Sequence, residues 1–348
     1  MKNILMLKTH SAGIGDLLRS SASWRALKNH FNNSKLNLLF LSDNPGYPSE
    51  KLISKHHLLD SFYVIDKRDM NKISGIKRVI KESSEIIEKI NPDFVIDFEP
   101  YGLETTIVSM VARFKYKIKT LGINEIFPRG LLYSQYSSSV KKFMKENNIK
   151  ILNYTDRDFV VLSALGIKRN NIPIEIEETE EAKKFRENLK LKLNTDKKIL
   201  GINIGCGTSD ALPKRPNLDL VVSVAKYLKE KYDYFILLFG ADYEKDTNAE
   251  FIKRFGNSKD IYDLAGKTDI LEVVGAINLT DLFISSDSGP YHIAVALKKP
   301  TVAIFNFENP AHYHHHEWVR CIVAPNMNYK DDLIQACEEV ISFREYNS

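Results

Sequence analysis

The sequence DLFISSDSGPYHIAVALKKPTVAIF, residues 281–305, contains a complete strand, turn, helix and second strand. Its two ends, 281–285 and 301–305, are apolar in the manner of strands that are buried on both faces. The segment between them begins with small residues and continues at helical spacing from Pro290, a favoured first helical position. This pattern predicts parallel strands in a sheet that helices cover on both sides.

The turn Asp287-Ser288-Gly289, at the start of this helix, is a candidate anion site. The backbone N–H groups of Ser288 and Gly289 and the positive end of the helix dipole attract negative charge. Asp287 either orients the turn or contacts a ligand hydroxyl. His292, one turn into the helix, either donates to a phosphate or packs as an ordinary helix histidine, and the sequence leaves both alternatives open.

The same alternation of strand and helix extends along the whole chain of 348 residues, a length that predicts two domains. In the second half, two further strands are expected, at 199–204 and 234–239. Helices are expected there at 217–231, 245–255, 270–279 and 290–298. In the first half, strands are expected at 4–7, 36–41, 62–65 and 94–96. We therefore predict an α/β protein with two Rossmann-like, doubly wound domains that face each other across a cleft.

The predicted boundaries are residues 1–175 for the first domain and 176–328 for the second, with a C-terminal helix over 329–348. A polar, charge-dense stretch separates the two periodic regions. The C-terminal helix is amphipathic, and we expect it to pack back on the first domain. Its apolar side consists of Leu333, Ala336, Cys337, Val340 and Ile341.

The segment after the strand 199–204 has the residues that a diphosphate requires. Gly207 supplies a glycine turn, Thr208 and Ser209 supply hydroxyls, and Lys214 supplies a cation shortly before the next helix. The spacing does not match a Walker motif. A solvated basic loop is the alternative interpretation.

Glu244 follows the next strand of the second half, at 234–239. In a doubly wound sheet, an acidic residue at this point binds the hydroxyls of a ribose. Asp242 and Asp246 lie close enough in the sequence to do the same. The sequence therefore predicts one ribose-binding carboxylate in this segment, with Glu244 as the first candidate.

Gly13-Ile14-Gly15-Asp16 stands directly after the first strand and opens a helix. The two glycines predict a turn that a substrate can approach closely, with Asp16 on the acceptor side. Leu18 occupies the position where a dinucleotide-binding fingerprint requires its third glycine, although Asp43 could still serve as the ribose-binding acid. The alternative for Asp16 is a first-turn acid that the helix dipole stabilises.

Two segments contain residue types that often bind metal ions, but their arrangement does not favour a metal site. Neighbouring histidines in the stretch 312–316 point in different directions, so we expect a loop that lines the cleft rather than a metal centre. Asp156 and Asp158 have the form of the DxD metal clamp of other sugar transferases, but they lie in a helical pattern, where a solvated face is expected. The three cysteines form no CxxC pair. No metal and no cofactor is predicted.

The net charge of +4 and the pI near 8.6 are too small, over this length, to indicate a nucleic-acid partner. They suit anionic phosphate substrates or contact with an anionic membrane surface. The sequence has no apolar stretch of the length of a signal peptide or a membrane span. We therefore expect a cytoplasmic protein that is able to associate peripherally with the cytoplasmic face of the inner membrane.

Together, these segments resemble glycosyltransferase family 9, the ADP-heptose:lipopolysaccharide heptosyltransferases, which have the GT-B fold. The resemblance spans nearly the whole chain, and its most specific part is the block 281–305. The other matching segments are GIGDLLRSSASWRALK at 13–28, the glycine turn with Lys214, GADYE at 240–244 and DLAGKT at 263–268.

The resemblance implies an inverting, metal-independent transferase that moves heptose from ADP-heptose to the inner core of lipopolysaccharide or lipooligosaccharide. Its partners are then an ADP-sugar donor, bound by the second domain, and a lipid-linked saccharide acceptor, bound by the first. The alternatives are a related transferase with another sugar or acceptor, a GT-B-like nucleotide-sugar epimerase, and a binding protein without activity.

The resemblance also assigns roles to residues. Asp16 is the general base, Lys214 neutralises the diphosphate and Glu244 holds the ribose. The phosphates are cradled by Asp287, Ser288, Gly289 and His292, while Thr208 and Ser209 match donor-binding positions less closely.

The sequence departs from the family pattern at three places. Arg19–Ala22 replaces a Thr-Pro-x-Leu stretch, and Lys214-Arg215-Pro216 replaces Lys-x-Trp-Pro. Phe305-Asn306-Phe307 replaces Phe-Gly-Pro after the last matched strand.

Overall fold

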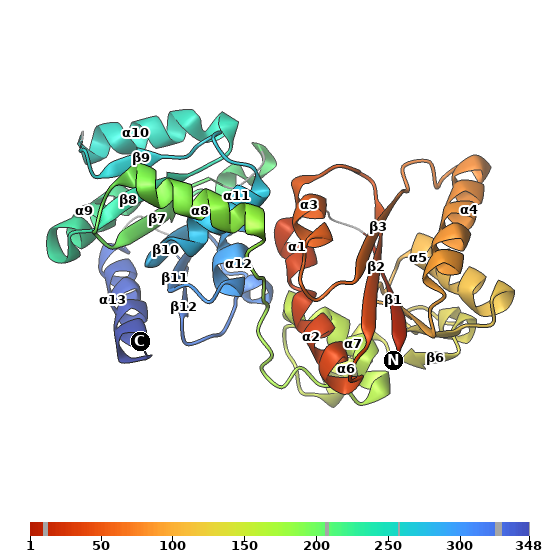
Figure 1. Cartoon of the computed structure of the whole chain (residues 1–348). Coiled ribbons are helices and arrows are strands. Elements are labelled where there is room, and N and C mark those ends of the chain that lie inside the picture. The colour runs from red at the N-terminus through yellow and green to blue at the C-terminus, as the bar shows by residue number, and fades with distance from the viewer. Residues whose placement is uncertain (10–12, 206–208, 257, 324–328, 348) are drawn as a thin grey trace. The chain divides into compact units, whose positions relative to one another are not determined.

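The computed structural model describes residues 1–9, 13–205, 209–256, 258–323 and 329–347. The chain divides into two compact units, Met1–Ile174 and Glu175–Ser348. Each unit contains one six-stranded sheet, and all neighbouring strands in both sheets are parallel. The prediction of two doubly wound α/β domains is therefore confirmed in its architecture (Figure 1).

The first sheet has the strand order β3-β2-β1-β4-β5-β6. Its chain reverses direction across the sheet between β1 and β4, which is the topological switch point where such sheets bind ligands. The elements of this unit are β1 (Asn3–Lys8), α1 (Ile14–Leu18), α2 (Ser21–His30), β2 (Lys35–Ser42), α3 (Pro48–Ser54), β3 (Ser61–Asp66), α4 (Ile73–Ile90), β4 (Phe94–Asp97), α5 (Leu103–Met110), η1 (Val111–Lys115), β5 (Lys119–Ile123), η2 (Arg129–Leu132), β6 (Gln135–Ser137), α6 (Val140–Glu146), η3 (Tyr154–Asp156), α7 (Arg157–Leu162) and η4 (Ser163–Leu165).

The second sheet has the order β12-β11-β10-β7-β8-β9, the same topology with its switch point between β7 and β10. The elements of this unit are α8 (Glu180–Leu193), β7 (Ile199–Asn203), η5 (Ser209–Lys214), α9 (Leu218–Tyr232), β8 (Phe235–Phe239), η6 (Asp242–Glu244), α10 (Lys245–Phe255), β9 (Ile261–Asp263), α11 (Ile270–Asn278), β10 (Leu282–Ser286), α12 (Gly289–Ala296), β11 (Thr301–Phe305), η7 (Pro310–His312), β12 (Val319–Val323) and α13 (Lys330–Asn347).

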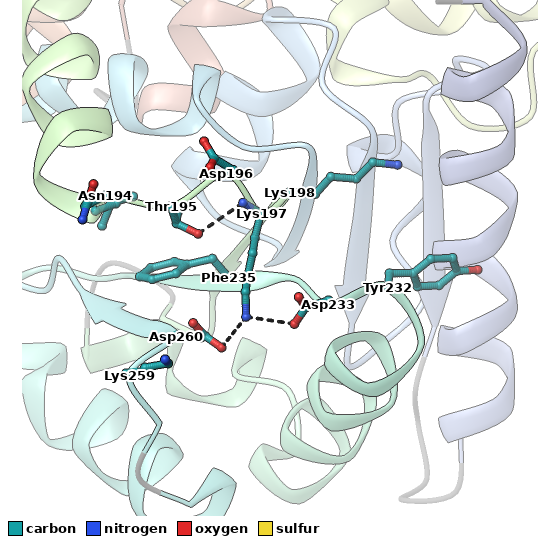
Figure 2. Close-up of a pocket in the computed structure, with 11 residues that line it drawn as sticks. Asn194, Thr195, Asp196, Lys197, Lys198, Tyr232, Asp233, Phe235, Lys259 and Asp260 are labelled. Carbon is teal, nitrogen blue, oxygen red and sulfur yellow. Dashed lines mark hydrogen bonds and ion pairs between the residues drawn. The ribbon is translucent and has the colours of Figure 1, made fainter.

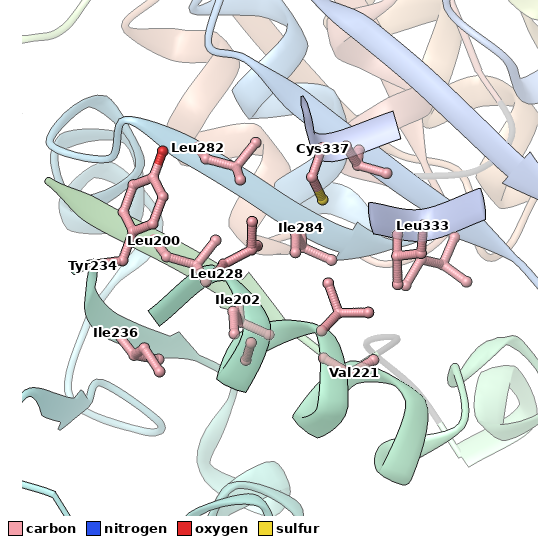
Figure 3. Close-up of a cluster of buried hydrophobic side chains, with 14 of the residues drawn as sticks. Leu200, Ile202, Val221, Leu228, Tyr234, Ile236, Leu282, Ile284, Leu333 and Cys337 are labelled. Atoms are coloured by element: carbon pink, nitrogen blue, oxygen red, sulfur yellow. The ribbon is translucent and has the colours of Figure 1, made fainter. Parts of the chain in front are cut away.

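The core of the second unit explains why its strands are apolar on both faces. The helices α9, α10 and α13 pack in one group and α8, α11 and α12 in another, so that helices flank the sheet (Figure 1). All residues of β7, β8, β10 and β11 are buried. Figure 3 shows side chains of β7 and β10, such as Ile202 and Ile284, meeting Val221 of α9 and Leu333 of α13.

The expectation that the C-terminal helix packs back on the first domain is wrong. The apolar side of α13 belongs to the core of the second unit, where Leu333 and Cys337 are fully buried against α9 and the strands (Figure 3). Burial also raises the pKa of the Cys337 thiol, which behaves here as a small apolar side chain. The amphipathic pattern identified the buried face of the helix but not the surface that covers it.

Candidate functional site

Short polar side chains join the carboxyl ends of β7 and β10 at the switch point of the second sheet. Asn203 lies opposite Ser285 in the register, and its Nδ2 donates to Ser285 Oγ at 3.3 Å and to Ser288 Oγ at 2.9 Å. Asn203 Nδ2 also donates to the Gly205 carbonyl at 3.2 Å, and Ser286 Oγ donates to the same carbonyl. Buried polar groups without hydrogen-bond partners would destabilise the fold, and these bonds supply such partners. The same bonds fix the two turns relative to each other.

The turn after β10 carries a carboxylate that contacts a lysine and a histidine. Asp287 is 4% exposed, and its Oδ2 lies 2.9 Å from Lys214 Nζ and 3.2 Å from His312 Nδ1. Burial alone would raise the pKa of Asp287, but the hydrogen bonds from His312 and Lys214 outweigh it and hold that pKa well below its usual range. Asp287 therefore brings Lys214 and His312 together at one point.

The helix α12 begins beside this carboxylate. Ser288 is its N-cap, with an extended backbone at φ −152° and ψ 173°, and Gly289 and Pro290 are its first residues. The amino end of a helix favours anions through its free N–H groups and its dipole. The arrangement places that favourable end, Lys214 and His312 around the same turn.

Glu244 is the last residue of η6, the short helix that follows the neighbouring strand β8, and it is buried. Its Oε2 accepts from the Ala241 N–H at 2.8 Å, and its Oε1 lies 3.8 Å from Arg215 Nη2. A Cβ at Gly205 would come within 1.8 Å of Glu244 Oε1, so only glycine admits this carboxylate beside the turn after β7. The structure thus brings Glu244, Lys214 and Asp287 to one edge of the sheet.

His292 is buried in α12, and its Nδ1 lies 2.9 Å from His314 Nε2. The loop that follows β11 is anchored through this pair and through the His314 N–H, which donates to the Tyr291 hydroxyl at 3.0 Å. Of the two alternatives for His292, this geometry favours packing in the helix. His312, in the same loop, is the histidine whose ring meets Asp287.

Sequence reasoning identified Asn306 only as a departure from the family pattern and gave it no role. Its Nδ2 donates to the carbonyls of Pro213 and Arg215, at 2.7 and 2.5 Å, which are the residues on either side of Lys214. The amide therefore clamps the backbone that carries the lysine. The contacting residues are more than 90 positions apart in the sequence, so no local pattern reveals them. Gly207 and Thr208 lie outside the described residues, and the side chain of Ser209 is likewise not described.

In the first unit, Asp16 stands exposed in the first turn of α1. Gly13 caps this helix with φ −56° and ψ 140°, a conformation open to any residue, and its carbonyl accepts from the Leu17 N–H at 3.2 Å. The Gly15 carbonyl accepts from the Arg19 N–H at 3.0 Å. The segment is a regular helix start at the end of β1, with its acid facing solvent.

A largely buried lysine lies near Asp16. Lys8 Nζ donates to Asp158 Oδ1 at 2.7 Å and to Ser20 Oγ at 2.8 Å, and Ser23 Oγ donates to Asp158 Oδ2 at 2.8 Å. Burial would lower the pKa of Lys8, but the Asp158, Glu99 and Asp16 carboxylates raise it above its ordinary value. The expectation of a solvated face at Asp158 is wrong, because this side chain is buried and ion-paired with a residue of β1.

The end of β4 carries a different kind of carboxylate. Asp97 is fully buried, and its Oδ2 accepts from Arg129 Nη2 at 3.0 Å and from the Tyr133 hydroxyl at 2.7 Å. Burial raises the pKa of Asp97 to about 6, although Arg129 and Tyr133 act in the opposite direction. Arg129 also donates to the Pro100 carbonyl at 2.5 Å, so this cluster fastens the loop before β6 to the loop after β4.

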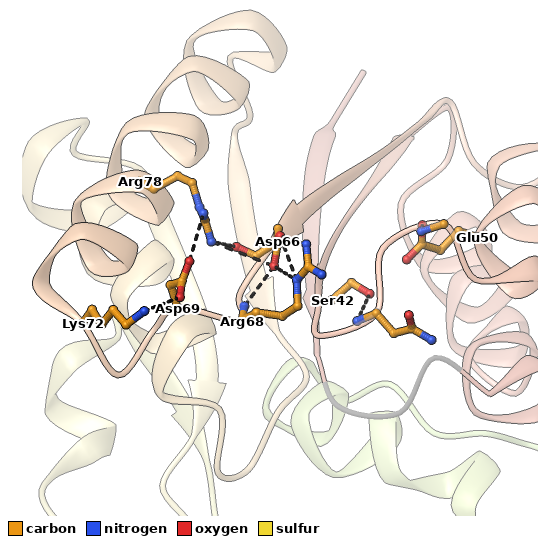
Figure 4. A network of polar contacts seen from close by, with 9 residues as sticks. Ser42, Glu50, Asp66, Arg68, Asp69, Lys72 and Arg78 are labelled. Atoms are coloured by element: carbon orange, nitrogen blue, oxygen red, sulfur yellow. Dashed lines mark hydrogen bonds and ion pairs between the residues drawn. The ribbon is translucent and has the colours of Figure 1, made fainter.

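At the end of β3, exposed charges neutralise one another (Figure 4). Arg68 Nη2 lies 2.6 Å from Asp66 Oδ2, and Arg78 lies 3.7 Å from Asp69. Hydrogen bonds from Arg68 lower the pKa of Asp66 to about 2. Each of the cations Arg68, Lys72 and Arg78 therefore already has a carboxylate partner at this strand end.

A pocket of about 620 Å³ lies at the opposite, amino edge of the second sheet, beside Phe235 (Figure 2). Its main cation, Lys197, is within 2.7 Å of Asp260 and 3.0 Å of Asp233. Lys229 pairs with the same two aspartates. Lys197 and Lys229 therefore already have carboxylate partners, and the pocket lies away from the strand ends where the candidate residues gather.

Among the described side chains, no three histidine, cysteine, aspartate or glutamate residues come together in a group able to hold a metal ion. The histidines at 312–316 accordingly serve other contacts: His312 meets Asp287, His314 meets His292, and His316 stacks on Trp318 with ring centroids 4.5 Å apart. Within the same described residues, no helix combines the length and apolar character that crossing a bilayer requires.

Comparisons with known proteins agree with this architecture. The family model of glycosyltransferase family 9 (heptosyltransferase) matches residues 156–335, which is more than half of the chain. Lipopolysaccharide heptosyltransferase 1 of Campylobacter coli is 22% identical over 295 residues, 84% of this chain and 81% of that protein.

Two solved structures share the fold over nearly their full length. A glycosyltransferase family 9 protein of Veillonella parvula superposes with a TM-score of 0.77 at 18% identity, over 98% of this chain and 97% of that one. The ADP-heptose lipopolysaccharide heptosyltransferase II of Escherichia coli gives 0.70 at 16% identity, over 99% and 100%. At these identities the likeness establishes the fold, and it confirms the GT-B class.

If this strand end binds a nucleoside diphosphate such as ADP, replacing Asn306 with aspartate should weaken that binding about 10- to 100-fold. The amide donates to two carbonyls, whereas a carboxylate would repel them and release the segment that carries Lys214. Isothermal titration with ADP measures the effect. Asn309→Asp is the matched control, because it places the same charge three residues further along the same loop, and equal affinities of the two variants would contradict the role assigned to Asn306.

Proposed function

This chain belongs to glycosyltransferase family 9, and we propose that it transfers heptose from ADP-heptose to the inner core of lipopolysaccharide or lipooligosaccharide, with inversion and without a metal ion. The sugar and acceptor follow the names of relatives, namely lipopolysaccharide heptosyltransferase 1 and ADP-heptose lipopolysaccharide heptosyltransferase II. The second unit binds the nucleotide sugar in this proposal, and the first unit binds the lipid-linked saccharide.

The observation that carries the proposal is the group of charges at the β7/β10 switch point. A nucleoside diphosphate needs cations and N–H donors for its phosphates and an acceptor for its ribose hydroxyls. Lys214, His312 and the start of α12 meet the first need, and the Glu244 carboxylate on the adjacent strand end meets the second. Ser288 and Gly289 contribute the backbone of the turn.

Asp287 prepares this site in the absence of the donor. Its carboxylate holds Lys214 and His312 in place, which reduces the reorganisation that donor binding requires. When the diphosphate arrives, its oxygens take over as partners of the two cations. His312 thereby adds a second hydrogen-bonding side chain to the Lys214 of the family pattern, and His292 supports it indirectly by anchoring the loop at His314.

Asp16 is the general base of the proposed reaction. It removes the proton from an acceptor hydroxyl as that oxygen attacks the anomeric carbon from the side opposite the diphosphate. The bond between the anomeric carbon and the diphosphate oxygen breaks, and ADP leaves with an additional negative charge. Lys214, His312 and the helix start stabilise that charge. Asp16 is suited to this role because it is exposed, and Gly13 and Gly15 leave the adjacent backbone uncrowded by side chains.

A transfer assay tests the proposal directly. Purified protein and ADP-heptose should convert lipooligosaccharide truncated either before or after its first heptose to a product one heptose heavier by mass spectrometry, in EDTA as well as in buffer. ADP should be released in equal amount. Product from another nucleotide sugar but not from ADP-heptose would overturn the donor assignment, an epimer formed without acceptor would indicate an epimerase, and loss of activity in EDTA would overturn metal independence.

Asp16→Asn should reduce kcat by about 10²–10⁴-fold, the usual contribution of a general base, because an amide cannot accept the proton. Affinity for ADP should stay within about twofold, since the residue is assigned to the acceptor. The assay above gives kcat and isothermal titration gives the affinity. Asp43→Asn, a second acid that follows a strand of this unit, is the control, and near-normal turnover in Asp16→Asn would refute the assignment.

Lys214→Ala should lower kcat by a factor on the order of 10²–10³ and change the donor KM much less. The charge on the leaving oxygen grows as the bond breaks, so a fixed cation stabilises the transition state more than the bound donor. His312→Ala should show the same pattern with a smaller loss. Lys226→Ala, at an exposed lysine of α9, serves as the control. An effect of Lys214→Ala on KM alone would reduce the lysine to a binding residue.

A further inference from the structure

The helix α5 and its continuation η1 expose an apolar stripe. Leu103, Ile107, Met110 and Phe114 recur every three or four residues and therefore share one side of the helix. Leu103 is 64% and Phe114 50% exposed, and the two residues between them are half-buried. The opposite side of the helix already packs in the core of the unit, through Val108. The fold of this unit therefore does not require apolar side chains on the exposed side of the helix.

The loop before β6 adds further apolar side chains to this stripe. Ile126, Phe127 and Leu131 are 57%, 80% and 61% exposed. Arg129 Nε donates to Thr106 Oγ1 at 2.9 Å, and Arg113 Nη1 donates to the Leu131 carbonyl at 2.7 Å, so the loop is fastened along α5. We call the combined surface the α5 face. It comprises Leu103, Ile107, Met110, Phe114, Ile126, Phe127 and Leu131.

Positive charge borders the α5 face. The segment 113–119 carries four cations, of which Lys115, Lys117 and Lys119 are exposed, and the Arg113 guanidinium lies 5.0 Å from the centre of the Phe114 ring. The acidic residues nearby are engaged. Glu104 pairs with Lys67 at 2.7 Å, Glu125 accepts from the Val140 N–H at 2.6 Å, and Glu88 accepts from the Tyr116 hydroxyl and lies 3.9 Å from Lys115 Nζ.

The whole first unit, which carries the α5 face, is also more positively charged than the second. Residues 1–174 contain 27 Lys and Arg against 17 Asp and Glu, whereas residues 175–348 contain 22 against 28. The small net charge of the chain therefore conceals a strongly basic first unit and an acidic second unit. A basic unit with a large exposed apolar face is complementary to an anionic surface that also offers an apolar interior.

We propose that the α5 face docks on an anionic lipid bilayer. Phe127, Leu131 and Phe114 enter the boundary between headgroups and acyl chains, and the cations of the segment 113–119 lie among the anionic headgroups. A protein partner would satisfy the apolar side chains, but it would not account for a charge excess that extends over the whole unit. The proposal needs only this surface and does not rest on the proposed function, although a lipid-linked acceptor would give the docking its purpose.

Sedimentation with vesicles tests the proposal. Wild-type protein should bind vesicles of phosphatidylcholine and phosphatidylglycerol at least tenfold more tightly than vesicles of phosphatidylcholine alone, and salt should weaken that binding. Phe127→Ser with Leu131→Ser should reduce binding at least tenfold, because each loses several buried CH₂ groups. Lys115→Glu with Lys117→Glu should reduce binding to the anionic vesicles specifically.

Leu191→Ser is the matched control, since Leu191 is 78% exposed but lies on α8 of the second unit. This variant should bind vesicles as the wild type does. Unchanged ADP affinity and circular dichroism in the α5-face variants show that folding and the donor site are intact, whatever the outcome of the transfer assay. Wild-type protein that ignores anionic vesicles, variants that bind as well as wild type, or a dimer in solution that the serine substitutions dissociate would each overturn the proposal.

Discussion

Burial of both sheets on both faces is the constraint on which the rest of the structure depends. A parallel strand between two helical layers has no solvent-facing side, so polar residues are pushed to its ends. In β10 this leaves Ser285, Ser286 and Asp287 at the carboxyl end, opposite Asn203 at the end of β7. The strand order then brings these two ends together at the point where the chain changes direction across the sheet. The chemistry of the second unit is concentrated there for that reason.

Two buried aspartates show how neighbouring groups decide what a carboxylate does. Burial opposes charge on both of them. At Asp287 the hydrogen bonds from His312 and Lys214 win, so the group remains ionised and gathers cations. At Asp97 burial wins over Arg129, and the pKa rises to about 6. In the first arrangement, a phosphate can replace the Asp287 carboxylate as the partner of Lys214 and His312. The Asp97 cluster instead fastens loops that carry part of the α5 face.

Two departures from the family pattern contact each other in the fold. The segment Lys214–Pro216 lacks one residue of the usual pattern, and Asn306 stands where that pattern has glycine. The Asn306 amide bonds to the carbonyls on both sides of Lys214, so a side chain that glycine does not have holds the altered segment. Considered separately along the sequence, the two changes have no evident relation, because they lie more than 90 residues apart.

The sequence by itself determined the alternation of strands and helices, the two units, the strand-end positions of Asp16, Glu244 and Asp287, and which side of α13 is buried. Period and composition are local properties, and these features follow from them. Short strands that carry polar residues, such as β6 and β9, escaped prediction because their apolar signal is weak. Only the tertiary structure decided three further points. The helix α13 covers the second sheet, Asp158 is buried and paired with Lys8, and His312 rather than His292 contacts Asp287. Each of these depends on a partner distant in sequence, and an amphipathic or charged pattern specifies that a partner is needed without specifying which one.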